Sequence, residues 1–518
     1  MNGTPSPRDR PHRLESQVAG LVSQAVPVLW ASLLVLLPIS SFPPLAAVAG
    51  GVVAPLAAVP ALLLLIVWVI PRLLQGHPLP ALSGPLFAFV GIAVLASAAS
   101  MFLELYPFLG QPVAGRSLRA LATLGIGLTF FLTAATYPTT EGRLRGSMRW
   151  LAAGAVAMLV WSTIQAALLR GDEPIPWQLR DFHRLFSVRD LNADRVTGFA
   201  FEPSWLADQL VILYLPLWLG ATLVGFSAFP KLAGRLPAEA LLFGWGLIVL
   251  ILTKSRIGIL SALAVAAILG VALIWRLGGR VLTLPGAGKI ASLMRGRALS
   301  IGFRLFLLAA LLGLLVAGVY LMGKVDPRVA RVFTVRPGQL AGGSHAVYEY
   351  ASQLAYAERV MYWVSGLKAF ALHPLLGVGL GNTGFLFRES VPVFGYSLPE
   401  ITTILNGAPQ FPNPKSLWVR LLAETGVVGF LVFVLWLVMM GLGAARLARS
   451  SAVILRVVGL SALLALGTQV FEGLSLDSFA LPQLWIVLGL VAAGLSTSLG
   501  SPSRSGGNED PAPARPAY

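Results

Sequence analysis

A few charged side chains stand immediately beside long apolar stretches of this sequence. The stretch RVTGFAFEPSWLADQL begins with Arg195 and holds Glu202 just before an apolar run, and further on similar places are occupied by Arg256, Arg359 and Lys415. The guanidinium of arginine is a planar fork that holds two oxyanion oxygens at once. A carboxylate is ready to accept a proton at neutral pH, whereas lysine must first be made neutral. These residue types favour a site that binds an anion and moves a proton.

His373 is a further candidate for proton transfer. It opens the stretch HPLLGVGLGNTGF, whose glycines predict tight turns with close backbone approach. The glycines do not follow a strand and open a helix, so a nucleotide-binding loop is not indicated. A His-Pro pair at a helix end also serves packing alone, and this structural role is the competing interpretation.

Each of the other candidates has a structural alternative as well. Arg256 and Lys415 are also explained as interfacial anchors at helix ends. Glu202 precedes Pro203 at a regular helix start, where a negative charge is favoured by the helix dipole. Glu424 falls inside an apolar run, so we expect it to face the interior with a polar or cationic partner.

Composition assigns these residues to an integral membrane protein. The mean hydropathy is +0.78, and only 12% of the 518 residues are charged. Such a chain has too little polar surface to coat a soluble fold. Apolar runs of about 18 to 25 residues suit helices that cross the bilayer, whereas the short alternating segments of a β-barrel are lacking. The predicted fold class is an all-α membrane bundle.

The hydrophobic pattern predicts twelve transmembrane helices. The spans are expected near 18–39, 44–70, 84–103, 117–136, 144–168, 204–227, 237–253, 257–275, 303–322, 416–442, 454–472 and 480–497. Pro55 and Pro60 predict that the second span is kinked or broken. Lys and Arg gather in the connections on one side, including 276–302, which places the N-terminal tail 1–17 and the tail 498–518 in the cytoplasm. The second tail is expected to be disordered.

Two longer connections, at 170–203 and at 323–415, then fall on the opposite, external side of the membrane. The second is far longer than an ordinary connection, which indicates a functional segment. Residues 351–372 place Leu354, Met361 and Leu367 near a helical period, with further apolar residues at 360, 364, 371 and 372. This spacing predicts a helix that lies on the membrane surface or caps the bundle.

The absence of cysteine removes disulfides, thiolate chemistry and cysteine-ligated metals. No acidic cluster on the external side suggests a metal, so the cations of the site are expected to be Arg or Lys, without a cofactor. The net charge of +16 is explained by the positive-inside rule and anionic headgroups, and nucleic acid is not expected as a partner.

Three motifs in this order resemble the O-antigen ligase and polymerase superfamily of bacterial envelope proteins. They are LTKSRIGIL at 252–260, ERVMYWVSGLKAFALHPLLGVGLGN at 358–382, and KSLWVRLLAETGVVGF at 415–430. The resemblance, which spans roughly residues 195 to 430, implies a GT-C-like glycosyltransferase in the bacterial inner membrane. Such an enzyme takes a glycan from an undecaprenyl-diphosphate carrier at the external face. It transfers the glycan to another lipid-linked glycan, as a polymerase, or to the lipid A core, as a ligase.

One departure from the family pattern favours the polymerase. Members that read His-Asn followed after seven residues by Glu use the histidine in the ligase reaction, and counting back from Glu424 gives Lys415 here. We therefore expect Arg256, Arg359 and then Arg195 to hold the diphosphate. The catalytic candidates are Glu202, as the leading base, Lys415 and His373.

The resemblance also names the partners. They are the undecaprenyl-diphosphate-linked oligosaccharide, the lipid bilayer and, as a further candidate, a chain-length regulator or flippase of the same pathway. A secondary transporter is the alternative from another class, because twelve spans with both ends inside also suit a transporter. Matching Gly/Pro-broken spans in the two halves would favour it, and we find none in the sequence.

Overall fold

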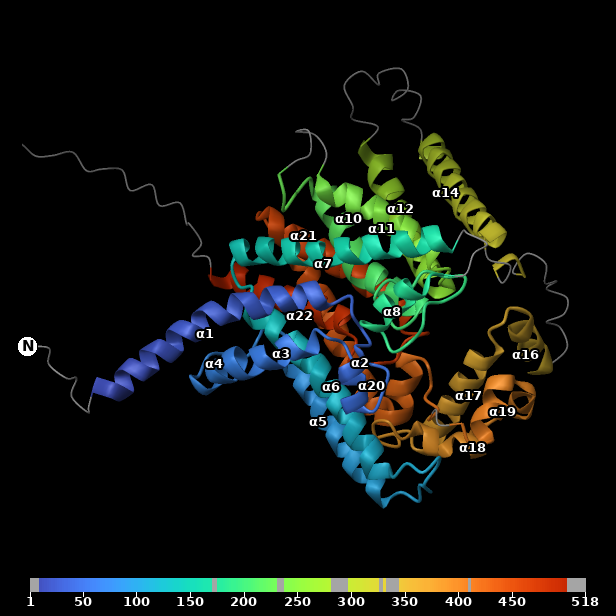
Figure 1. The fold of residues 1–518 in the computed structure, drawn as a ribbon. Helices are drawn as coiled ribbons and strands as arrows, with labels where there is room; N and C mark the ends of the chain where they lie inside the picture. Colours follow the sequence, from blue (N-terminus) through green and yellow to red (C-terminus); the bar gives the residue numbers. More distant parts are fainter. Residues whose placement is uncertain are drawn as a thin grey trace, which may run out of the picture.

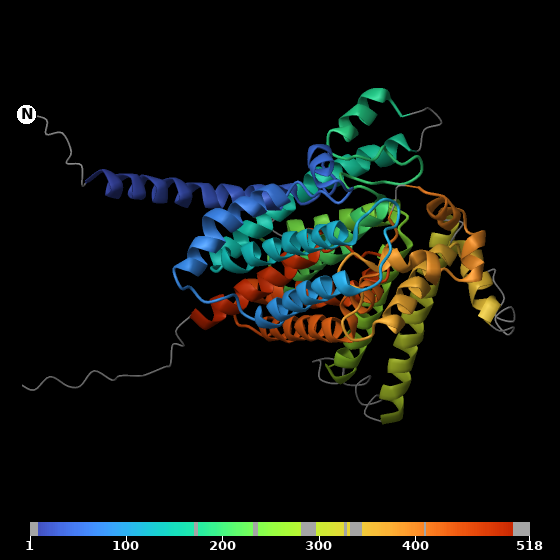
Figure 2. The same ribbon diagram turned by 90° about the horizontal axis from the view of Figure 1, so that it is seen from below.

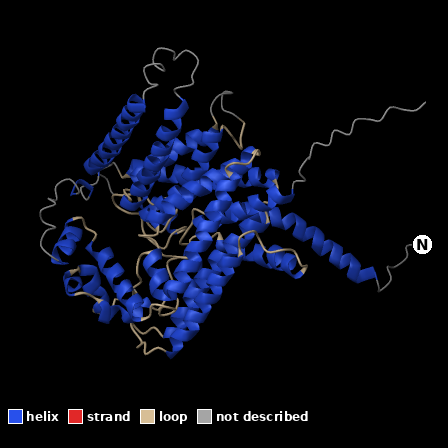
Figure 3. Ribbon diagram, turned by 180° about the vertical axis from the view of Figure 1, so that it is seen from behind, coloured by secondary structure: helices blue, strands red, loops and turns tan. Residues whose placement is uncertain are grey.

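The computed structural model describes residues 9–169, 175–230, 237–280, 297–325, 329–331, 344–408 and 411–500. Within these ranges the chain is a bundle of α-helices joined by loops, and it forms isolated bridges but no strand (Figures 1 and 3). Most of the predicted cytoplasmic connection 276–302, much of 323–415 before residue 344, and the tail after residue 500 lie outside the described residues.

The helices of the first half are α1 (Asp9–Leu36), α2 (Pro43–Ala49), α3 (Ala58–Leu64), α4 (Ile70–Leu74), α5 (Gly84–Ala99), α6 (Val113–Thr136), α7 (Glu141–Leu168), α8 (Trp177–Arg184), α9 (Pro203–Asp208), α10 (Leu215–Val224) and α11 (Ala238–Leu252). Those of the second half are α12 (Arg256–Arg280), α14 (Arg297–Val325), α16 (Ser344–Gln353), α17 (Ala357–Leu372), α18 (Phe387–Ser390), α19 (Pro399–Leu405), α20 (Leu417–Leu447), α21 (Val453–Glu472) and α22 (Pro482–Gly500). Single turns of π-helix, Leu65–Val69 and Gln209–Tyr214, join α3 to α4 and α9 to α10.

The helices confirm the predicted fold class. Eight of them in the described residues are long and apolar enough to cross a membrane, and four shorter apolar helices accompany them at 22–36, 58–74, 238–252 and 482–498. Each of the twelve predicted spans has a helical counterpart among these segments. The chain is therefore an all-α, multi-pass membrane protein.

The second predicted span, 44–70, is broken, as Pro55 and Pro60 predicted. The helix begins at Ala58 rather than at 44, and the preceding residues form the short helix α2, which ends at Gly50 with φ of +63°. Between them the chain is extended and bridges Ala54 to Ser41. Pro55 lacks the N–H that a continuous helix needs and restricts the residue before it, which explains the break.

Small residues let the central helices pack closely. A methyl group on Gly489 of α22 would lie 2.5 Å from Ala134 of α6, and one on Gly459 of α21 would lie 2.3 Å from the backbone of Ala448 after α20. In membranes, where lipid tails are as apolar as leucine, such close approach is a main source of helix association. The large aromatic side chains Trp436 and Trp218 are fully buried in the same core.

Helices α16 to α19 form a separate layer at one end of the bundle. Figure 2 shows them at the end opposite to the start of α1 and the end of α22. This layer rests on the bundle through α17, which packs against α20. The described ends of the chain therefore lie on the side of the bundle away from the layer that the sequence predicted to be external.

The predicted helix within 351–372 is confirmed as α17. Met361 is buried, whereas Leu367 and Leu372 are exposed on the outer face of the helix. Gly366 faces α20, where an added methyl group would lie 2.5 Å from the side chain of Val419. α17 therefore packs on α20 through a small residue and leaves these leucines on its outer face.

A kink in α20 receives the glycine-rich turn that follows α17. Gly426 interrupts α20 with φ of +64° and ψ of −172°. The freed N–H of Val427 donates to the carbonyl of Pro374 at 2.8 Å, and the N–H of Val378 donates to the carbonyl of Ala423 at 2.9 Å. A methyl group on Gly426 would lie 2.1 Å from the carbonyl oxygen of Leu375, so glycine is required. The second and third sequence motifs therefore interlock.

Candidate functional site

A cavity of about 200 Å³ gathers four of the six predicted site residues. It is lined by Arg195, Glu202, Ser204, Lys254, Ser255, Arg256, Ile257, Tyr356, Arg359 and Ser475. These residues come from the loop before α9, the first turns of α9, α12 and α17, and the segment after α21. The structure thus brings together Arg195, Glu202, Arg256 and Arg359 from segments that are distant in sequence. We refer to this space as the cationic cavity.

A tight turn between α11 and α12 supplies two of the cations. Lys254 has a φ of +47°, rare for a residue with a side chain, and its N–H donates to the carbonyl of Ile251 at 3.0 Å. The hydroxyl oxygen of Thr253 accepts the N–H of Ser255 at 3.1 Å and fixes the start of α12. Lys254 and Arg256 consequently line the cavity from one turn, and strained backbone of this kind is often kept at functional sites.

Arg195 is docked onto the same turn. Its Nε donates to the carbonyl of Thr253 at 2.9 Å, and the N–H of Val196 donates to the carbonyl of Leu252 at 3.2 Å. A cation at these carbonyls is also favoured by the C-terminal dipole of α11. Arg195 therefore fixes the loop before α9 as well as lining the cavity.

Arg256 and Arg359 tie the outer helices to the bundle. The guanidinium of Arg256 donates to the carbonyls of Leu354 and Ala355 at 2.6 and 3.0 Å. Nη1 of Arg359 donates to the carbonyl of Ser475 at 3.0 Å. The two guanidinium carbons lie 5.6 and 5.9 Å from the ring centre of Tyr356. Two forked cations therefore contact the same aromatic ring.

Burial raises the pKa of Tyr356 above its usual range, against the charges of Arg359 and Arg256, which lower it. Its phenol therefore stays neutral at neutral pH and does not serve as the base. It is suited to donating a hydrogen bond from the wall of the cavity.

Glu202 is the carboxylate of the cavity. It occupies the N-cap of α9 in extended conformation, but its side chain does not cap the helix. One oxygen accepts from Nη1 of Arg189 at 2.9 Å and the other from the hydroxyl of Ser204. A favourable interaction with the dipole of α9 therefore does not fully explain Glu202, because Arg189 and Ser204 orient its side chain at the cavity wall.

The cavity is strongly biased toward binding anions. Its lining carries the cations Arg195, Lys254, Arg256 and Arg359 against the single carboxylate of Glu202. The first turns of α12 and α17 also open onto it, and helix N-termini favour negative charge. Two anionic groups held together, such as a diphosphate, match this distribution of charge.

Lys415 belongs to a different cluster. Its ammonium pairs with Glu400 and lies 4.3 Å from the ring centre of Tyr362, whose hydroxyl donates to the same carboxylate at 2.8 Å. Burial acts to raise the pKa of Glu400, but hydrogen bonding and attraction from Lys415 hold it below its usual value. Burial and the charge of Glu400 raise the pKa of Glu358. Lys415 thus joins α17, α19 and the start of α20, and it does not line the cavity.

His373 lies at the other end of α17. It is the C-cap residue, and its N–H donates to the carbonyls of Ala369 and Phe370. At the rise of an α-helix, the fourteen residues from Arg359 correspond to roughly 21 Å. The structure does not bring His373 to the cavity, and its contacts suit the competing structural role.

Glu424 has the interior position and the cationic partner that its sequence context predicted. Its side chain is buried, and it accepts from Nε of Arg420 at 2.8 Å and from the hydroxyl of Thr383 at 3.2 Å. This pair braces α20 just before its kink.

Six lining residues were not predicted from the sequence, and Lys254, Tyr356 and Ser475 are the three of them that bear most on the site. Lys254 and Tyr356 lie within or beside the stretches that carry Arg256 and Arg359, so their position in the sequence could have indicated that they line the same site. Ser475 follows a different span, and it contributes a backbone carbonyl that no residue type reveals. Among the described residues no group of three or more His, Cys, Asp or Glu could hold a metal ion.

Residues 241–434 match the family Wzy_C, described as O-antigen ligase. The matched segment contains the α11–α12 turn, Arg359 and the kink in α20, and the resemblance noted in the sequence is confirmed. No curated protein matches the chain. Over this segment the chain is therefore similar to the O-antigen ligase family, and the match indicates a glycosyltransferase-like membrane enzyme that acts on lipid-linked substrates.

Proposed function

We propose that this protein is a polymerase of lipid-linked glycans. It transfers a glycan from an undecaprenyl-diphosphate-linked donor to a second lipid-linked glycan at the external face of the bacterial inner membrane. The observation that carries the proposal is the cationic cavity, where Arg195, Lys254, Arg256 and Arg359 meet one oriented carboxylate. The family match supports the same class of reaction.

The reaction assigns a role to each group. An acceptor hydroxyl oxygen attacks the anomeric carbon of the donor sugar, and its proton passes to Glu202. The bond between that carbon and the phosphate oxygen breaks, and the diphosphate leaves with the electron pair. Arg256 and Arg359 hold the growing negative charge, with Lys254 and Arg195 beside them. Cationic side chains thus take the part that a divalent ion has in many sugar-nucleotide enzymes.

Lys254 replaces Lys415 as the proposed third phosphate contact. Lys415 pairs with Glu400 outside the cavity, whereas Lys254 lines the cavity beside Arg256 and has only a long contact, 4.0 Å, with the exposed Asp194. His373 is not carried forward as a base because of its distance along α17. Glu202 remains the leading candidate, since its two donors leave it as an oriented carboxylate.

The ligase is the second candidate, supported by the description of the matched family. Its acceptor would be the lipid A core. The position at which ligase-type members carry histidine holds Lys415, which is engaged with Glu400. This difference favours the polymerase.

Purified protein and an undecaprenyl-diphosphate-linked oligosaccharide test the proposal. Longer lipid-linked glycans from this substrate alone would support a polymerase. A product that forms only after lipid A core is added would identify a ligase instead. No covalent product with either acceptor would contradict the proposed chemistry and favour the transporter.

The proposed topology places both chain ends in the cytoplasm and the cavity outside. It is supported by the Lys/Arg bias of the connections and by the position of α16 to α19 opposite to the described ends (Figure 2). Reporter fusions within 276–302 and 323–415 should give opposite signals. A cytoplasmic signal from both would overturn the placing of the site.

A further inference from the structure

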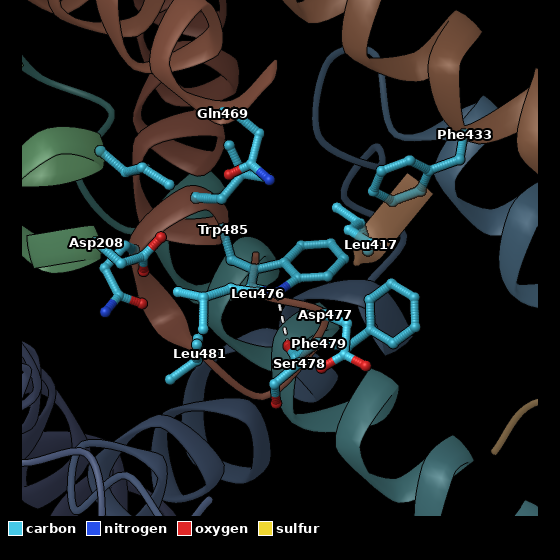
Figure 4. A pocket seen from close by; sticks show the side chains of 13 residues that line it. Asp208, Leu417, Phe433, Gln469, Leu476, Asp477, Ser478, Phe479, Leu481 and Trp485 are labelled. Carbon is cyan, nitrogen blue, oxygen red and sulfur yellow. Dashed lines mark hydrogen bonds between the residues drawn. The ribbon is translucent and has the colours of Figure 1, made fainter. Parts of the chain in front are cut away.

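A second, smaller pocket of about 40 Å³ lies inside the helix bundle. Its polar residues are Asp208, Gln469, Asp477, Ser478 and Gln483, and its apolar wall includes Phe433, Phe479 and Trp485. In Figure 4 the polar ends of Asp208 and Gln469 turn toward the space beside Trp485, with Asp477 and Ser478 below that ring. No lining residue is shared with the cationic cavity. We call this space the inner pocket.

Several polar groups of the inner pocket are buried without a partner. Gln483 is 2% exposed, and within the described protein neither its amide nitrogen nor its amide oxygen has a hydrogen-bond partner. The same holds for Oδ2 of Asp477. Buried polar groups are almost always satisfied, and the pocket has room for more than one water-sized occupant. These groups indicate that something polar occupies the pocket.

Two of the polar residues of the inner pocket, Asp208 and Asp477, carry carboxyl groups. Asp208 is buried, and among the described residues no Lys or Arg forms an ion pair with Asp208 or Asp477. Arg420 lies nearby, but it pairs with Glu424 at 2.8 Å and donates to the backbone carbonyl of Asp477 at 2.6 Å rather than to its carboxylate. Two carboxylates therefore face one small pocket without a cationic side chain of their own.

A third carboxyl group, that of Glu472, lies near Asp208. Glu472, at the end of α21, is a further buried carboxylate that repels Asp208. It accepts from the hydroxyl of Ser261 at 3.0 Å, while its other oxygen has no hydrogen-bond partner in the described protein. Ionisable groups inside a membrane bundle are rare and commonly mark ion or proton pathways.

The oxygen donors define the class of ligand. Carboxylate and amide oxygens are preferred by hard cations. Since no group of three or more His, Cys, Asp or Glu in the described chain could hold a metal ion, the set suits a monovalent ion better than a divalent one. The pocket also lies where regular helix ends, between the π-turn Gln209–Tyr214 and the non-helical residues 476–481. In secondary transporters, interrupted helices commonly coordinate sodium, and π-turns often mark functional sites.

We propose that the inner pocket binds an alkali cation of sodium or potassium size. The bound cation would hold the segment after α21, in which Ser475 faces the cationic cavity and the next residues face the inner pocket. Because the carbonyl of Ser475 accepts from Arg359, occupancy of the inner pocket also positions a wall of the cationic cavity. The binding itself does not rest on the proposed transferase function.

Binding of ²²Na⁺ to the purified full-length chain in detergent tests the proposal, with choline chloride keeping the ionic strength constant. We expect saturable binding near one ion per chain, and competition by excess unlabelled Na⁺ or K⁺. Replacing choline by Na⁺ or K⁺ should also raise the Tm by about 3 °C or more, because only the folded state has the site. Asp208→Asn should lose both effects.

Glu239→Gln is the matched control. Glu239 is an equally buried carboxylate, but it already accepts from the hydroxyl of Ser227 and the N–H of Ala228, both at 2.7 Å. Ion binding should persist in this variant. If Asp208→Asn does not fold, ²²Na⁺ binding to the unaltered chain still tests whether the inner pocket binds a cation. Absence of saturable ²²Na⁺ binding, or an equal Tm in all three chlorides, would show that the pocket holds only water and protons and would overturn the proposal.

Discussion

Arg256 and Arg359 are the residues on which the proposed chemistry depends most. Arg256→Ala and Arg359→Ala should each lower the transfer rate by ~10²–10³, the usual effect of removing one donor from a site of developing negative charge. Arg→Lys should also impair transfer, because the two-pronged fork is lost. The measurement is the initial rate of glycan extension, with the Tm as a check of folding.

Arg184→Ala is the control for this pair, because Arg184 is exposed and bridges Asp190 and Asp181 outside the cavity. It should leave the rate unchanged. Near-normal rates in both cavity variants would show that the diphosphate does not bind in the cationic cavity.

Glu202→Gln should abolish turnover while donor binding persists. The amide keeps the shape of the side chain and a hydrogen-bond acceptor for Ser204, but it cannot take up a proton. Donor affinity and single-turnover rate, measured on the same preparation, separate the two effects. Retained turnover would mean that Glu202 only orients the start of α9.

At the scale of elements, the kink in α20 and the turn after α17 should be stable only together. Gly426→Ala places a methyl group against the carbonyl of Leu375 and forces a φ of +64° on an L-residue. The strain alone costs about 1–2 kcal/mol, and the overlap adds to it. We expect a clearly lower Tm in a thermal melt.

Gly441→Ala is the comparison within the same helix. Its added methyl would lie 3.5 Å from Leu466, an ordinary contact, and alanine favours the helix over glycine. Its Tm should be unchanged or higher. Equal melting of the two variants would show that the interlock of turn and kink contributes little.

Helix α8 should loosen as the pH falls. Burial lowers the pKa of His183 to about 4, against opposing contributions from the Arg189 backbone and Asp190. Its stabilising contribution is therefore complete above the unfolded value of about 6.5 and is lost as the pH falls toward 4. The full effect amounts to about 3 kcal/mol. Hydrogen exchange of α8 between pH 7 and pH 4 measures it, and His183→Phe should flatten the profile. An unchanged profile in that variant would contradict this assignment.

Sequence reasoning predicted elements better than their contacts. The twelve apolar runs were found because crossing a bilayer requires length and apolarity, which are local properties. Pro55 predicted the break in the second span, whereas the packing of α17 through Gly366 depends on backbone geometry that the apolar pattern does not reveal. Arg195, Arg256 and Arg359 were recognised by charge at span ends, whereas the partner of Lys415 depends on how α19 folds back.

In the whole molecule, the cationic and the acidic side chains gather in two different places. The cationic cavity lies among loop residues and helix starts, next to the layer of α16 to α19, and it is rich in guanidinium groups. The inner pocket lies among spanning helices and is rich in carboxylates. The residues after α21 form part of both walls, so the anion site and the proposed cation site share one segment.

We propose that side-chain cations of this cavity, rather than a metal ion, support glycan transfer from a lipid diphosphate. The most direct test is the length distribution of lipid-linked glycans made by the purified protein in EDTA, compared with that of Arg359→Ala. Extension should proceed in EDTA at the rate seen with magnesium, and the variant should fail under both conditions. Glycan extension that is lost in EDTA and restored by magnesium would show that a metal ion, rather than the arginine side chains alone, supports transfer.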